Sequence, residues 1–122
     1  MTDIFDPRIC DNHRQRFGEK RGLTLINAAQ SSLTQYASEL QEGFATQNLE
    51  QMIRAAHSLK SSAANLGAGQ LRAGAESLEL RYTQGADLTL LEPVEAVIAL
   101  VQATLLEVQA YLEVWGQSKN QE

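Results

Sequence analysis

The last third of the chain carries its most regular hydrophobic pattern. Apolar residues recur there in alternating steps of four and three, at Val94, Ile98, Val101, Leu105, Val108, Leu112 and Trp115. This spacing places them on one face of an α-helix, whereas a half-buried β-strand would need strict alternation of apolar and polar residues. The pattern predicts a long amphipathic helix that begins between Asp87 and Pro93 and ends at Gly116, with a polar tail over 117–122.

Three further segments repeat the same periodicity. The first is expected over about 23–45. The second begins after Asn48, a good N-cap residue, and ends at Gly67, a residue typical of the position just after a helix. The third ends near Gly85. We interpret the apolar face of each helix as core, which makes an antiparallel four-helix bundle the most economical architecture.

A short helix is expected before these four. Asp6 suits its N-cap, Pro7 its first position, and Gly18 its end. His13 on this helix is interpreted as packing against the bundle. We therefore predict an all-α fold, an antiparallel four-helix bundle with a short extra N-terminal helix over 1–18. At 122 residues the chain fits a single domain, 1–122, with its core over about 23–115.

Charge and composition exclude several classes of function. The net charge of −5 argues against nucleic acid as the main partner, since phosphate binding needs a basic face. The single cysteine, Cys10, excludes an internal disulfide and fits a reducing compartment. No apolar run approaches the roughly 20 residues needed to span a bilayer, and the first residues lack the features of a signal peptide. We expect a cytoplasmic protein that contacts no membrane.

Catalytic motifs are scarce in this chain. It has no Gly-rich phosphate loop, no cluster of Cys and His with metal-ligand spacing, and no nucleophile elbow. Paired acidic residues such as Glu76 and Glu79 are interpreted first as a solvated helix face. We expect no cofactor and no metal of its own.

One histidine has unusual neighbours. On the predicted helix, Arg54 and Lys60 lie three residues to either side of His57, and Ser61 and Ala64 follow on the same face. A neutral imidazole can accept a phosphoryl group, and nearby cations disfavour a positive ring and stabilise the phosphoryl charge. Small neighbours leave room for a partner. The pattern favours a phosphoryl-accepting histidine, and the alternative from spacing alone is an ordinary surface residue.

The run from Ala56 to Ala68, AHSLKSSAANLGA, closely resembles the signature of histidine-containing phosphotransfer domains of bacterial multistep phosphorelays. The layout is also similar, because the signature falls on the second of four bundle helices that follow a short N-terminal helix. The resemblance implies that His57 is phosphorylated, that Lys60 helps to neutralise the phosphoryl group, and that Glu79 orients the ring.

The chain departs from the family pattern at one position. The residue after Lys60 is commonly Gly in the family and is Ser61 here, a small residue whose hydroxyl is available to the phosphoryl group. No Pro follows His57 as it does in the dimerising histidine helix of sensor kinases, and nothing remains to build an ATP-binding domain. We therefore expect neither autophosphorylation nor ATP hydrolysis.

The resemblance predicts a phosphorelay intermediate. It would accept a phosphoryl group onto His57 from the receiver-domain aspartate of a hybrid sensor kinase, and pass it to the receiver of a response regulator. The receivers are expected to supply Mg²⁺. Docking candidates share the exposed side of the second and third bundle helices: Arg54, Ser58, Ser61, Ala64 and Gln70. We expect a monomer, because all four apolar stripes can be used inside one bundle.

Two other classes of function fit the sequence less directly. The chain could be a docking module that binds and sequesters a receiver or a kinase with His57 unused, and such a module should tolerate substitution of His57. It could also be a helical scaffold, for which binding of a receiver domain would be the discriminating observation.

Overall fold

The computed structural model describes the backbone of residues 3–120 and the side chains of residues 3–115. The fold is all-α over these residues, as the periodicity predicts, and no strand occurs among them. Five helices follow one another along the chain: α1 (Pro7–Phe17), α2 (Glu19–Thr46), α3 (Leu49–Leu66), α4 (Gly69–Thr83) and α5 (Glu92–Asn120).

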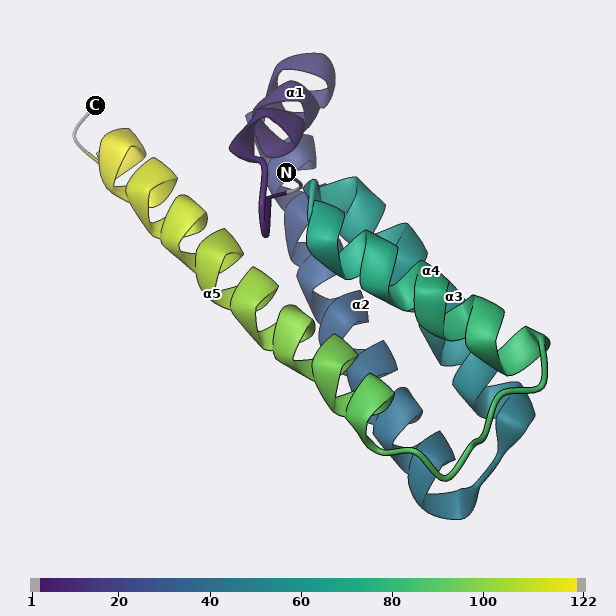
Figure 1. Ribbon diagram of the computed structural model, residues 1–122. Helices are drawn as coiled ribbons and strands as arrows, with labels where there is room; N and C mark the ends of the chain where they lie inside the picture. Colours follow the sequence, from purple (N-terminus) through teal and green to yellow (C-terminus); the bar gives the residue numbers. More distant parts are fainter. Residues whose placement is uncertain (1–2, 121–122) are drawn as a thin grey trace.

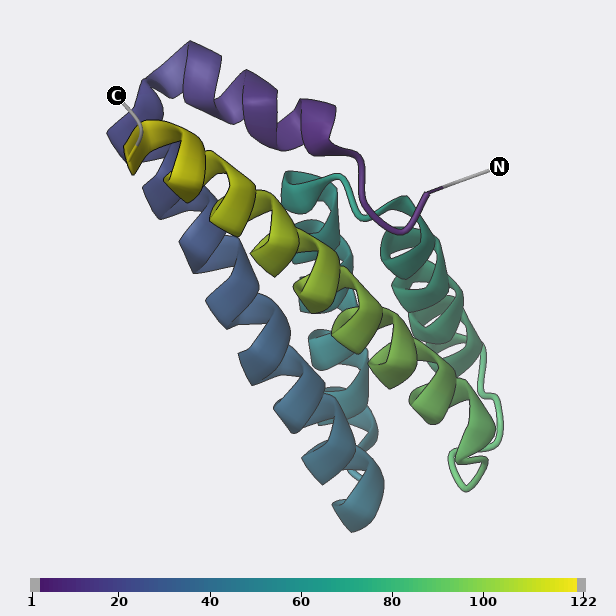
Figure 2. The same ribbon diagram turned by 90° about the vertical axis from the view of Figure 1, so that its left-hand side faces the viewer.

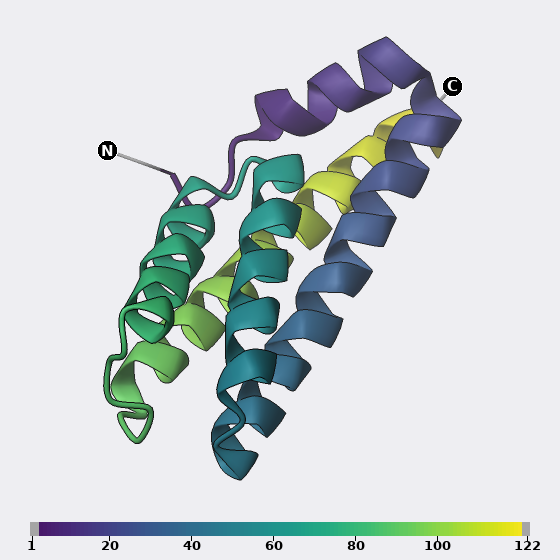
Figure 3. The same cartoon turned by 90° about the vertical axis from the view of Figure 1, so that its right-hand side faces the viewer.

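The four longer helices pack side by side into an elongated bundle, and α1 lies across one end of it (Figures 1 and 2). The chain reverses between α2 and α3 at one end and between α3 and α4 at the other (Figure 3). Helix α3 contacts α2 and α4, and α5 contacts the same two helices. The α3–α4 pair and the α2–α5 pair therefore form opposite sides of the bundle.

The core is built largely from the predicted apolar stripes, but on α5 Val97 and Thr104 are buried although they lie outside the stripe, while Ile98, Leu105 and Leu112 are only partly buried. Its largest buried side chains come from all four long helices: Ile26, Leu33, Leu40, Met52, Leu59, Leu66, Leu71, Leu78 and Val108. Burying each such side chain contributes about 1.5–3 kcal/mol relative to leaving it exposed. On α3, Met52 and Ala55 are fully buried, Ile53 is only partly buried, and Leu49 at the start of the helix is 40% exposed.

The predicted signals end and begin most helices correctly. The side chain of Asp6 accepts a hydrogen bond from Arg8 N at 3.0 Å, and that of Asn48 accepts one from Gln51 N at 3.1 Å. Gly67 follows α3 in the left-handed conformation, with φ of 74°. These caps satisfy backbone groups that have no partner within the helix.

Two helix boundaries differ from the prediction. Helix α2 begins at Glu19 rather than near Leu23, and Gly22 lies inside it. A Cβ at Gly22 would lie 2.7 Å from the Arg14 Cα, so this glycine lets α1 and α2 approach closely. Helix α5 does not end at Gly116 but continues to Asn120, because a glycine weakens a helix by only about 1 kcal/mol unless the chain turns there. Residues 121–122 of the predicted tail lie outside the described residues.

Helix α5 is strongly apolar. Residues Glu92–Trp115 reach a mean hydropathy of 1.4 over 18 residues, of which 22% are buried. By length and composition alone this helix could cross a membrane, a test that core helices of soluble proteins also pass. Val94, Val97, Val101 and Val108 lie in the core, while Leu106 is 74% exposed on the opposite face.

Candidate functional site

His57 lies on the outer side of α3, one position beyond the core. Ala55, Ala56 and Leu59 around it are fully buried, whereas the His57 side chain is 59% exposed. The buried neighbours hold this turn of helix in place against α2 and α4. The ring is therefore exposed to solvent on a rigid backbone. A side chain that a partner protein must reach needs this arrangement.

A single carboxylate joins His57 to Lys60. His57 Nδ1 lies 2.8 Å from Glu79 Oε2, and Lys60 Nζ donates to Glu79 Oε1 at 2.9 Å. Glu79 belongs to α4, so this pair of contacts crosses from α3 to α4. The Glu79 side chain is only 19% exposed, which limits screening of both interactions by water.

The contact with Glu79 sets which ring nitrogen is open. An ionised carboxylate only accepts hydrogen bonds, so Nδ1 of His57 carries the proton in this contact. Nε2 has no hydrogen-bond partner among residues 3–115. A neutral His57 ring therefore presents the lone pair of Nε2 on the exposed side of α3.

The charge state of Glu79 follows from two opposing effects. Burial by itself raises the pKa of Glu79, but hydrogen bonds and charge interactions with Lys60 and His57 outweigh it, and the pKa falls below its usual value of 4.5. Glu79 is thus ionised at neutral pH and acts as an acceptor toward both neighbours.

Replacing Glu79 by Gln is expected to reduce stability at neutral pH, with the cost shrinking as the pH falls below 4.5. A carboxylate whose pKa is lower in the folded than in the unfolded chain stabilises the fold above the unfolded value and loses this effect as it is protonated. Urea unfolding of the wild type and Glu79→Gln across the acid range measures the difference. Glu76→Gln, at an exposed position of the same helix, is the matched control for the loss of one carboxylate. A cost that grows on acidification would contradict the lowered pKa.

The other predicted site residues differ in their exposure and in their contacts. Arg54 is exposed on the turn before His57 and forms no ion pair with any residue in the described part of the chain. Ser61 is exposed, and its hydroxyl lies 3.4 Å from the backbone oxygen of His57, so it is directed back along the helix. Ser58 is partly buried and Ala64 is exposed on the same helix.

Gln70 lies farther from His57 than the other docking candidates. It is in the first turn of α4, nine residues before Glu79, which corresponds to about 13 Å along the helix. The structure brings His57, Lys60 and Glu79 together and places Gln70 at the end of the bundle.

Sequence reasoning missed how the N-terminal segment is held near this surface. Asp6 N donates to Gly67 O at 2.9 Å, and Gln70 N donates to Asp3 O at 3.2 Å. His13 Nε2 lies 2.7 Å from Asn65 O. His13 does connect α1 to the bundle, as predicted, but through a polar contact. These bonds clamp the segment onto the turn between α3 and α4, and no sequence pattern signals pairing between distant backbone groups.

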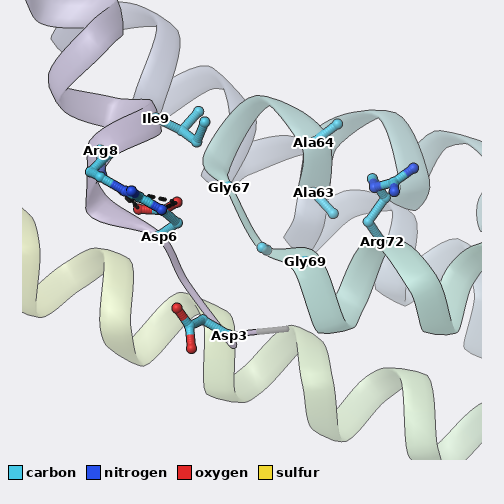
Figure 4. A pocket seen from close by; sticks show the side chains of 10 residues that line it. Asp3, Asp6, Arg8, Ile9, Ala63, Ala64, Gly67, Gly69 and Arg72 are labelled. Carbon is cyan, nitrogen blue, oxygen red and sulfur yellow. Dashed lines mark hydrogen bonds and ion pairs between the residues drawn. The ribbon is translucent and has the colours of Figure 1, made fainter. Parts of the chain in front are cut away.

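A shallow pocket of about 380 Å³ lies under this clamp (Figure 4). Its charged side chains are Asp3, Asp6, Arg8 and Arg72, two of each sign. Arg8 already donates to both carboxylate oxygens of Asp6, at 3.0 and 2.9 Å. The pocket therefore has no net charge that would select an ionic ligand, and Ala64 alone links it to the face of His57.

Comparison with known proteins identifies the family. A family model of the Hpt domain matches residues 24–113, a range that contains both His57 and Glu79 and excludes α1. No curated protein and no solved structure matches the chain. Because the match covers well over half of the sequence, this protein belongs to the Hpt domain family, whose members carry out histidine phosphotransfer in phosphorelay signalling.

Proposed function

We propose that this chain is a phosphorelay intermediate that accepts a phosphoryl group from a receiver-domain aspartate onto Nε2 of His57 and passes it to the aspartate of a second receiver. Hpt domains interact with receiver domains in phosphorelays. The observation that carries the proposal is the exposed His57 ring, whose Nδ1 is held 2.8 Å from Glu79 while Nε2 is open. We assign the donor receiver to a hybrid sensor kinase and the acceptor to a response regulator.

The transfer is a displacement at phosphorus. The Nε2 lone pair forms the N–P bond while the bond from phosphorus to the aspartate oxygen breaks, and the aspartate leaves as a carboxylate. The ring then carries a positive charge, which the ionised Glu79 stabilises through the Nδ1 proton. The reverse displacement delivers the group to the second receiver. No proton has to move in either direction, so this chain needs no general base.

The two cations near His57, Lys60 and Arg54, are suited to different roles. The Lys60 side chain is 28% exposed and its ammonium is bound to Glu79, which suits it to holding the carboxylate in place. Arg54 is exposed and is the cation better placed to meet an incoming phosphoryl group or receiver. We assign Mg²⁺ and most of the charge stabilisation to the receivers, with no cofactor on this chain.

The docking surface in this proposal is the exposed side of α3 and α4 around His57. Arg54, Ser58, Ser61 and Ala64 surround the ring with one cation and three small side chains, and Gln70 lies at the margin. An antiparallel four-helix bundle of α2 to α5 would serve as its rigid scaffold. A small surface with a polar rim suits a partner that binds transiently and leaves after transfer.

A transfer assay tests the proposal. The chain is incubated with a phosphorylated receiver and Mg²⁺, and its intact mass is followed under alkaline conditions. A mass increase of one phosphoryl group that is stable to alkali and lost in acid indicates phosphohistidine. Absence of label from a broad set of receivers, with the fold intact by circular dichroism, would contradict the relay and favour a docking module.

Changing Glu79 is expected to slow transfer rather than abolish it. Glu79→Ala removes the partner that holds Nδ1, so the ring samples other rotamers and tautomers, and the transfer rate should fall about 10-fold. Rates are measured by rapid quench at saturating receiver, which separates the chemical step from docking. Glu76→Ala, an exposed residue on the same helix, is the matched control. An equal effect of both variants would show that Glu79 acts only through surface charge.

A further inference from the structure

Helix α5 has a second apolar face in addition to the one in the core. Its members recur at helical spacing on the side that points away from the bundle: Ala99, Ala103, Leu106, Ala110 and Val114. Leu106 is 74% and Val114 67% exposed, the highest values for large apolar side chains in the described part of the chain. A helix that is apolar on both sides is normally covered on both sides.

A groove lies directly beside Leu106. It is lined by residues of α2 and α5, which lie side by side in Figure 2, and has a volume of about 790 Å³. Gln30, Ser31 and Thr34 line it from α2, and Gln102 and Gln109 from α5. Leu105 and Leu106 also line the groove, and Leu106 is 74% exposed, so one face of the molecule carries both a projecting apolar side chain and a hollow next to it.

The groove itself has no charged side chain in its lining, although the protein is acidic. Residues 22–38 of α2 and 96–106 of α5 contain no charged side chain, although 20% of the chain is charged and the net charge is −5. A charged partner would find nothing to pair with here. A membrane surface would be expected to meet basic residues, and none occurs over 92–115. A second copy of this acidic chain can approach the groove without placing like charges in it, and the exposed Glu107 and Glu113 limit this uncharged surface on the side of Ala110 and Val114.

We propose that the α2–α5 side is the interface of a symmetric dimer in which Leu106 of each copy enters the α2–α5 groove of the other. In a two-fold interface each contact occurs twice with the roles exchanged, so a projection and a hollow on the same face are what it requires. His57 belongs to α3 and its partner Glu79 to α4, and these two helices form the opposite side of the bundle (Figure 3). His57 of each copy therefore stays accessible to receivers. The expectation of a monomer considered only the apolar stripe of α5 that packs in the core, and not this second apolar face.

Sedimentation velocity over a range of protein concentrations tests the proposal. The wild type should approach twice the 13.4 kDa mass of one chain as concentration rises. Leu106→Arg places two unpaired charges in the interface and should weaken dimerisation at least about 30-fold. Leu80→Arg, on the exposed face of α4 where Leu80 is 50% exposed, should leave it unchanged. Circular dichroism verifies that each variant is folded.

A pair of complementary variants locates the contact. Thr34→Glu puts a negative charge in the wall of the groove and should also weaken the dimer. An equimolar mixture of Thr34→Glu and Leu106→Arg should recover dimers, since the introduced arginine of one chain then meets the introduced glutamate of the other, and the second groove receives an unchanged Leu106. A wild type that stays at the mass of one chain at all concentrations would overturn the proposal. Dimers insensitive to both variants, or association only with neutral lipid vesicles, would overturn it as well.

Discussion

The variant His57→Gln should accept no phosphoryl group from any receiver that labels the wild type. Gln has no ring nitrogen lone pair with which to attack phosphorus, so we expect the rate to fall by more than about 1,000-fold, to the detection limit. The His57 side chain is 59% exposed, and its removal should leave the fold intact. Intact mass under alkaline conditions and thermal unfolding of the same sample measure both effects.

The chain provides its own matched control, because it contains two histidines. His13→Gln keeps a side-chain donor that can reach Asn65 O, and His13 lies on α1, outside the group formed by His57, Lys60 and Glu79. This variant should be labelled like the wild type. Label that survives in His57→Gln but disappears in His13→Gln would assign the phosphorylated residue to α1 and contradict the proposed site.

The largest expected loss of stability from a single methyl group is at Gly67. Its φ of 74° costs an L-residue about 1–2 kcal/mol. A Cβ there would also lie 2.7 Å from Asp6 O and 2.7 Å from Ile9 Cγ1, so the N-terminal segment must move and lose its bond from Asp6 N to Gly67 O. Overpacking of this kind typically costs about 1–3 kcal/mol. Urea unfolding of Gly67→Ala should show a total loss of about 2–5 kcal/mol.

Gly85→Ala separates the two contributions. Gly85 has φ of 84°, and no atom lies within 4 Å of where its Cβ would be. Its replacement should therefore cost only the conformational penalty of about 1–2 kcal/mol. If both variants lose the same stability, the contact between the N-terminal segment and the α3–α4 turn contributes nothing to folding.

Much of the fold was readable from local rules. Helical spacing of apolar residues depends only on the period of the helix, and so it identified the long helices and most of their buried faces. Asp6, Asn48 and Gly67 act through neighbouring backbone groups, and each lies where predicted. The positions of Gly22 and Gly116 inside helices did not follow from local rules, because a glycine ends a helix only where the chain turns. At Gly22 the missing side chain lets the backbone of α1 at Arg14 pack closely against α2.

The sequence by itself determined the all-α fold and the presence of a histidine with two cations on one helical face, since both follow from residues three or four apart on one helix. Only the tertiary structure decided that Lys60 is bound to Glu79, that Nε2 is the open nitrogen, and that the N-terminal segment closes on Gly67. Those contacts join residues on different helices, and their distances depend on how the helices pack. The tertiary structure likewise decided which side of α5 is buried in the core, and therefore that Leu106 and Val114 on its other side are exposed.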